Sequence, residues 1–284
     1  NYNIISLFAG EPIDDIVASY SRYYTMIKSY SLPAMTSGYE LSWQAMIALG
    51  SLDFCQGRIV GEIASEDVTV PEFVKNGNAN PLEYYYLLKM ILLYLSGDHG
   101  GAMDSALEGK KYLDSVAGTM LVPEYYYYLS LIAHDFYFAG GIGKGACLKI
   151  LWKTERRFRR WSVDSPMNFG HMLHLVRAMH LNVLRGPAAA EEDCMKAVSA
   201  AHNGGFTQDY AFACELAGAL FSVRGNVTKS MEMVFNARDA YQKWGAIGKL
   251  SQLESKYPGF FTKSAADGEH AVQDLNMHSL FESM

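Results

Sequence analysis

The amino-acid sequence predicts an all-α protein, a right-handed α-solenoid of helical hairpins similar to tetratricopeptide repeats. Three observations support this fold class. Apolar residues recur at helical spacing along most of the 284 residues. No segment shows the sustained alternation of apolar and polar residues that is typical of a β-strand. A set of small and apolar residues also recurs every 40 to 44 residues, as in a repeat array.

Proline and glycine residues divide the chain into its expected helices. Residues 51–80 are less regular, and they allow a short helix after Pro71. We interpret residues 1–262 as one repeat array and residues 263–284 as a linker or the start of a further helix. The other expected helices cover residues 13–30, 33–49, 81–95, 101–116, 123–139, 144–161, 166–186 and 187–203, followed by two more on either side of a break at 224–226.

The repeat is defined by five residues separated by 3, 9, 4 and 3 positions. One copy is Ala178, Leu181, Ala190, Cys194 and Ala197, and the next is Gly218, Phe221, Ser230, Val234 and Ala237. Earlier copies start at Met90 and His134. Small residues in both helices of a hairpin let the two backbones approach closely, so that stacked hairpins share a core. The positions expected to carry this packing are Ala178, Ala190, Ala197, Gly218, Ser230 and Ala237.

Two stretches of the C-terminal half are more specific than a generic repeat: Pro166-Met-Asn168-Phe169-Gly-His171 and Trp244-Gly245-Ala246. The N-terminal half adds Phe8-Ala-Gly10 and Ser42-Trp43-Gln44. In these residues the chain resembles the helical region that follows the AAA/STAND-type ATPase module of large hybrid signalling proteins. Those proteins also hold a serine/threonine-kinase-like domain and often a GAF domain with a histidine kinase. The resemblance covers about residues 5–258, although Met172 stands where family members often have lysine.

The resemblance implies a segment that carries no catalytic residue, because the catalytic motifs of the family lie in other domains. We expect it to bind other domains of its parent protein, or a protein or peptide partner, and to transmit a signal in the cytoplasm. No cofactor or metal is expected. The alternative is that the repeats close over a small molecule, as the inducer-sensing arm of a STAND-type ATPase would. The start at Asn1 is interpreted as a cut through a longer chain.

Composition argues against several other classes of protein. The net charge of −6 is opposite to the positive field that a general nucleic-acid binder carries. No uninterrupted apolar run reaches the ~18 residues of a membrane helix. None of the four cysteines shares a CxxC spacing, which argues against a zinc site or a redox pair and favours reduced, buried thiols.

A basic run on one expected helix is the candidate site for a partner. It contains Arg156, Arg157, Arg159 and Arg160, preceded by Lys153. Such a run is either a docking patch for an acidic partner or a phosphate, or a helix face that is simply solvated. We favour the solvated face. On the docking interpretation, the residues that would contact a partner are Arg156, Arg157, Arg159 and Arg160.

Tyrosines and histidines leave further alternatives. The tyrosine clusters 84–86 and 125–128 either pack in the core or line an inner face that grips a peptide. His171 and His174 share a helix face, but a metal would need more ligands than these two. A structural role for the two histidines is therefore favoured over a third alternative, an all-α enzyme built on that face.

Overall fold

The computed structural model describes residues 2–261, and in this part of the chain every regular element is helical. The predicted segment 263–284 lies outside the described residues. Two short 3₁₀ turns, η1 (Phe54–Gly57) and η2 (Leu113–Val116), interrupt the series. In chain order the α-helices are α1 (Tyr2–Ala9), α2 (Ile13–Ser29), α3 (Pro33–Gly50), α4 (Glu66–Lys75), α5 (Ala79–Ser96), α6 (His99–Gly109), α7 (Leu121–Phe138), α8 (Lys144–Asp164), α9 (Pro166–Arg185), α10 (Pro187–Gly204), α11 (Thr207–Val223), α12 (Val227–Trp244), α13 (Ile247–Lys256) and α14 (Pro258–Phe261).

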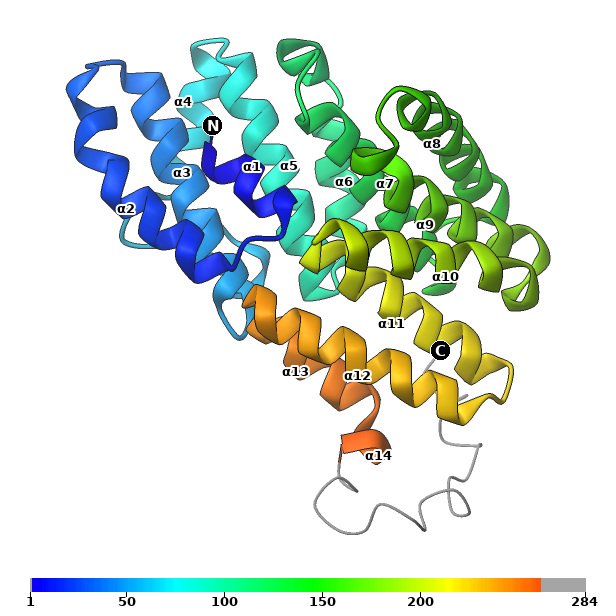
Figure 1. Ribbon diagram of the computed structural model, residues 1–284. Helices are drawn as coiled ribbons and strands as arrows, with labels where there is room; N and C mark the ends of the chain where they lie inside the picture. Colours follow the sequence, from blue (N-terminus) through cyan, green and yellow to red (C-terminus); the bar gives the residue numbers. More distant parts are fainter. Residues whose placement is uncertain (1, 262–284) are drawn as a thin grey trace.

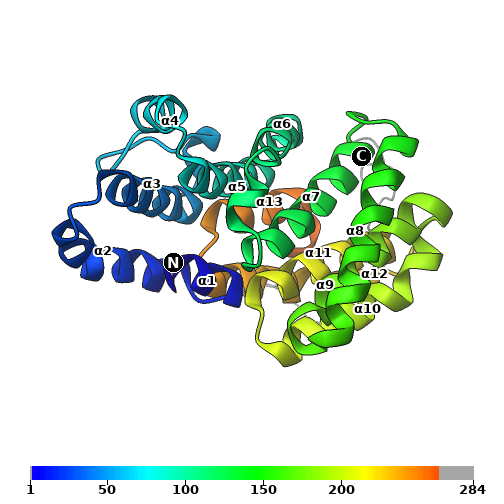
Figure 2. The same ribbon diagram turned by 90° about the horizontal axis from the view of Figure 1, so that it is seen from above.

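Successive helices pack against each other along the chain, which confirms the predicted all-α solenoid of helical hairpins. Figure 1 shows the hairpins side by side from α2 to α12, and Figure 2 shows their curvature from above. Within residues 2–261 no helix combines the length and the apolar character that a membrane span requires.

The four copies of the repeat fall on four hairpins, α5–α6, α7–α8, α9–α10 and α11–α12. The interval of nine residues crosses the turn between the two helices of each hairpin. The two helices of the last hairpin approach closely, and the Ser230 hydroxyl donates a hydrogen bond of 2.8 Å to the Gly218 carbonyl. The structure buries the residues expected at helix contacts: Ala178, Ala190, Ala197, Gly218, Ser230 and Ala237.

Two elements differ from the sequence prediction by more than three residues. α4 begins before Pro71, because the Ser65 side chain accepts a hydrogen bond from the Asp67 amide and so caps the helix N-terminus. Pro71 therefore lies inside the helix. The helix expected to end near Val116 is split, with α6 ending at Gly109 and η2 following it. The short α1 was not predicted.

The N-terminal and C-terminal parts of the solenoid are in contact. The Gln208 amide of α11 donates a hydrogen bond of 2.7 Å to the carbonyl of Phe8 in α1. Helix α13 packs against α3 and α5. Figures 1 and 2 both place the end of α1 beside the start of α11. The described helices therefore form a closed arrangement, in addition to the neighbour-to-neighbour packing that the sequence predicted.

Gly10 lies at a tight point of this closure. Its φ of +83° favours glycine, and a Cβ there would lie 2.5 Å from the backbone nitrogen of Thr207. Gly97 has a similar φ of +91°, but a Cβ there meets nothing within 4 Å. We expect Gly10→Ala to lower the free energy of unfolding by about 1 kcal/mol more than Gly97→Ala does, because only Gly10 adds overpacking to backbone strain. Urea denaturation of the two variants measures this, and equal losses would contradict the contact.

Aromatic rings fill the space on the inner side of the hairpins. The ring of Phe212 in α11 lies about 6 Å, centroid to centroid, from the rings of Tyr94, Tyr128 and Trp244. These four residues come from α5, α7, α11 and α12, and all of them are buried. The centre of the closed arrangement is therefore core rather than an open peptide groove. Of the predicted tyrosine clusters, Tyr125, Tyr127 and Tyr128 belong to this core.

Candidate binding surfaces

The four predicted docking arginines all lie on the exposed side of α8. Lys149, Lys153, Arg156 and Arg160 follow one another at helical spacing along the outer side of this helix. Arg157 and Arg159 flank them on either side. We call these six residues the basic face of α8. Figure 1 shows α8 at the edge of the molecule.

The arginines of this face differ in how they are held. Arg159 pairs with Glu155 at 2.6 Å, and the second oxygen of Glu155 accepts a hydrogen bond from His180. These hydrogen bonds, that from His180 first, hold the pKa of the Glu155 carboxyl below its usual range. Arg156 stacks 4.8 Å from the ring centroid of Trp152, and Arg157 lies 4.2 Å from that of Tyr126.

The basic face therefore keeps most of its positive charge. Among the described residues, Arg159 is the only one of the four predicted arginines that a carboxylate neutralises. Helix α8 carries seven basic and two acidic residues, although the whole chain has a net charge of −6. Such segregation of charge in an acidic chain produces a local positive potential on one side of the molecule.

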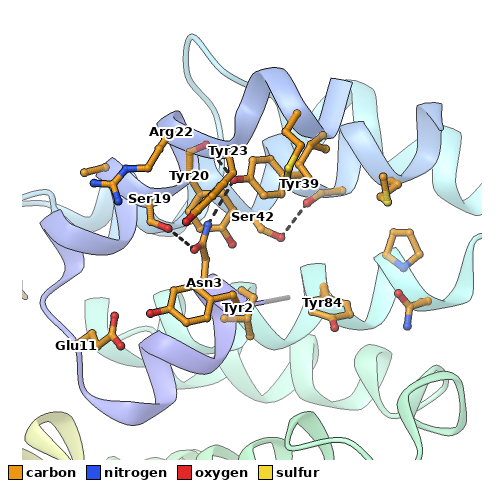
Figure 3. A pocket seen from close by; sticks show the side chains of 18 of the residues that line it. Tyr2, Asn3, Glu11, Ser19, Tyr20, Arg22, Tyr23, Tyr39, Ser42 and Tyr84 are labelled. Carbon is orange, nitrogen blue, oxygen red and sulfur yellow. Dashed lines mark hydrogen bonds between the residues drawn. The ribbon is translucent and has the colours of Figure 1, made fainter. Parts of the chain in front are cut away.

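A second surface is a cavity of about 660 Å³ between α1, α2, α3 and α5, which we call the N-terminal cavity. Figure 3 shows this cavity from close by. Five tyrosines from all four helices contribute to its wall: Tyr2, Tyr20, Tyr23, Tyr39 and Tyr84.

Hydrogen bonds fix part of this wall. The Tyr39 hydroxyl donates to the Tyr20 carbonyl at 2.9 Å, which joins α3 to α2. The Ser19 hydroxyl donates to the Asn3 side-chain oxygen at 2.7 Å, which joins α2 to α1. Figure 3 shows Asn3 and Tyr39 pointing toward each other across the cavity wall, with Ser42 beside them. Burial raises the pKa of Tyr39, so its hydroxyl stays neutral over the physiological range.

Charged side chains are few in the cavity wall. Glu11 and Asp15 are its acidic residues, and Arg22 is its basic residue. Within the described part of the chain none of these three forms an ion pair. Their charges are therefore available to a ligand.

The sequence did not reveal this cavity. Its wall includes α1, which was not predicted, and tyrosines of α2, a helix that the sequence predicts from its apolar periodicity. Only Tyr84 belongs to a tyrosine cluster that was considered for binding. The exposed apolar residues on the outward side of α2 were the available signal, and helical periodicity alone does not separate them from core residues.

The histidines that the sequence brought together are each held by a carboxylate of another helix. His171 lies 2.8 Å from Asp209, and His174 lies 3.0 Å from Asp193. The carboxylates could not be paired with the histidines from sequence, because they come from α11 and α10. No group of three or more metal-ligating side chains occurs within residues 2–261.

One buried carboxyl group stands apart from both surfaces. Glu83 of α5 is fully buried, and neither of its carboxyl oxygens has a hydrogen-bond partner in the described residues. Burial raises the pKa of Glu83 to about 8. The group is therefore protonated at neutral pH, because a buried carboxylate without partners is costly.

The fold places this chain among the all-α helical-repeat proteins. No protein-family model matches its sequence, and no curated protein or solved structure matches it either. The resemblance to the helical region of hybrid kinase–ATPase proteins therefore stays a prediction.

Proposed function

We propose that this chain is a non-catalytic interaction segment, which binds an acidic protein partner at the basic face of α8. The observation that carries this proposal is the concentration of unneutralised positive charge on one exposed helix of an acidic protein. Complementary charge accelerates association and excludes partners of the wrong sign. In a larger signalling protein of the cytoplasm, the partner is another domain or a separate protein.

Trp152 adds an apolar anchor to the basic face. Its side chain is 48% exposed and lies beneath the Arg156 guanidinium. Tryptophan and arginine are enriched among the residues that dominate the binding energy of protein interfaces. An acidic segment with an apolar side chain next to its carboxylates would use both groups, whereas a merely solvated helix face has no need of an exposed tryptophan.

Charge reversal tests the proposal with a fluorescein-labelled peptide of alternating glutamate and leucine as the probe. We expect the variant Lys153→Glu/Arg156→Glu/Arg160→Glu to weaken binding about tenfold or more in fluorescence anisotropy, because each reversal replaces attraction with repulsion. Higher salt should weaken wild-type binding in the same direction.

The matched control is Lys75→Glu/Lys110→Glu/Lys243→Glu, which makes the same change in net charge at exposed positions in α4, just after α6 and in α12. Binding to this control should stay within about twofold of wild type, since screening confines the effect to nearby charges. Equal weakening in both variants would mean that only net charge matters. That result, or no binding of the peptide to wild type, would refute the proposed surface. Calorimetry with ATP should detect no specific micromolar binding.

A second candidate function, small-molecule sensing, is favoured by the N-terminal cavity. Its volume of about 660 Å³ is within the range of ligand pockets in proteins, roughly 300–1,000 Å³. The aromatic filling of the inner side favours a discrete pocket over an extended peptide groove.

A further inference from the structure

We infer that the N-terminal cavity is a binding site for an organic cation with an apolar body. The inference rests on the small-molecule alternative and is independent of the basic face of α8. The cavity is formed by α1, α2, α3 and α5, so its residues are far from α8 in sequence.

Large apolar side chains at the mouth of the cavity are the first support. Tyr23 and Met26 of α2 are 41% and 48% exposed, and Met35 of α3 is 39% exposed. All three line the cavity. A ligand with an apolar body would remove this surface from water, at about 25 cal/mol per Å² of apolar area. Methionine also adapts its shape to varied apolar ligands.

Tyrosine rings and carboxylates together indicate the charge of the ligand. The electron-rich face of a tyrosine ring attracts a cation, and several rings around one space are the usual recognition site of an alkylated ammonium group. A contact between a cation and a tyrosine ring already occurs within α2, where the Lys28 ammonium lies 4.9 Å from the ring centroid of Tyr24. Tyr20 and Tyr39, which line the cavity, have ring centroids 4.7 Å apart.

The acidic residues of the wall outnumber the basic one. Glu11 precedes α2 and Asp15 lies in the first turn of that helix, and both residues line the cavity. Neither is neutralised by a lysine or arginine among the described residues, as noted above. An anionic ligand would be attracted by Arg22 but repelled by both carboxylates. The net charge of the wall therefore favours a cation.

Hydrogen bonds and ring stacking within the protein hold the wall in place. Asn3 and Tyr20 are almost fully buried, and the hydrogen bonds of Ser19 and Tyr39 tie α1, α2 and α3 together. Trp43 stacks behind Tyr20, with ring planes 8° apart and centroids 6.4 Å apart. Binding a rigid ligand to such a preformed site does not require the helices to rearrange, which lowers the entropic cost of association.

The test compares three small probes of similar shape by isothermal titration calorimetry. Phenyltrimethylammonium carries the charge, tert-butylbenzene is its neutral isostere, and benzoate is the anionic counterpart. We expect phenyltrimethylammonium to bind at least about fivefold more tightly than tert-butylbenzene, and benzoate to bind most weakly. Equal binding of the cation and its neutral isostere, a preference for benzoate, or no binding of the cation at millimolar concentration would each overturn the inference.

Neighbouring acidic residues supply a matched pair of variants. Asp14 and Asp15 both lie in the first turn of α2, but only Asp15 lines the cavity. We expect Asp15→Asn to weaken phenyltrimethylammonium binding about threefold, and Asp14→Asn to change it by less than about 1.5-fold. Similar effects of the two substitutions would show that the cation does not sit at the cavity. A failure here would leave the acidic-peptide result for α8 unchanged, so the two proposals fail separately.

Aromatic positions give a second pair. Tyr23 lines the cavity, whereas Tyr30, at the end of the same helix, is more exposed and does not. Tyr23→Leu keeps an apolar side chain but removes the ring. It should therefore weaken the binding of phenyltrimethylammonium more than the binding of tert-butylbenzene. Tyr30→Leu should leave both affinities unchanged. Loss of affinity for both probes in equal proportion with Tyr23→Leu would exclude a cation–ring contact.

Discussion

Replacing Gly218 with leucine is expected to lower the free energy of unfolding by about 3 kcal/mol. A Cβ at this position would lie 2.8 Å from the Val234 side chain and 3.4 Å from the Ser230 carbonyl oxygen. The contact is between the two helices of one hairpin, so a large side chain must push α11 and α12 apart. Urea denaturation monitored by circular dichroism gives the midpoint and the slope from which this change is obtained.

Gly170 provides the control for this substitution. It also lies within a helix, α9, but a Cβ there meets nothing within 4 Å. We expect Gly170→Ala to stabilise the protein by up to about 1 kcal/mol, because alanine has the higher helix propensity. An unchanged stability of Gly218→Leu would mean that the hairpin contact is misplaced. Destabilisation by Gly170→Ala would mean that its helix face is covered.

The second large effect concerns Glu83 and depends on pH. The pKa of Glu83 is about 8 in the folded protein, against an ordinary value of 4.5. Between these values the folded state holds a proton that the unfolded state has released, so stability falls as pH rises. The Glu83 contribution is complete below about pH 4.5 and is lost as the pH passes through about 8. Glu83→Gln removes this dependence.

We therefore expect Glu83→Gln to gain about 4 kcal/mol in free energy of unfolding relative to wild type between about pH 5 and pH 9. Taking the change with pH, rather than the difference at one pH, cancels the effect of the new amide on packing. Glu72→Gln removes a carboxyl from an exposed position of α4 and serves as the control. If the free energies of unfolding of Glu83→Gln and wild type differ by a constant amount across this pH range, Glu83 is not buried as a neutral acid.

The repeat hairpins could be predicted from sequence because their signals are local. Pro166, Pro187 and Gly205 each lie at a helix end, as expected from the restricted φ of proline and the freedom of glycine. The spacing from Gly218 to Ser230 follows from a fixed turn length between two helices. Such patterns need no knowledge of distant parts of the chain.

The sequence predicts one binding surface but not the other, again because only one of them depends on local signals. The basic face of α8 comes from one continuous helix, so its arginines could be recognised directly. The N-terminal cavity combines Asn3, Tyr23, Tyr39 and Tyr84 from four helices, and the side that each helix turns to the cavity depends on tertiary packing. Likewise, no local rule joins His171 to Asp209, which is 38 positions away.

The contact between Phe8 and Gln208 joins residues 200 positions apart. Bringing such distant segments together costs chain entropy that neighbouring hairpins do not have to overcome. The hairpins from α5 to α12 can therefore form by adding to one another, and α1 finds its place only after α11 exists. Folding should end with this long-range step, and early intermediates should show α1 amides that exchange freely with solvent while those of α9 to α12 are already protected.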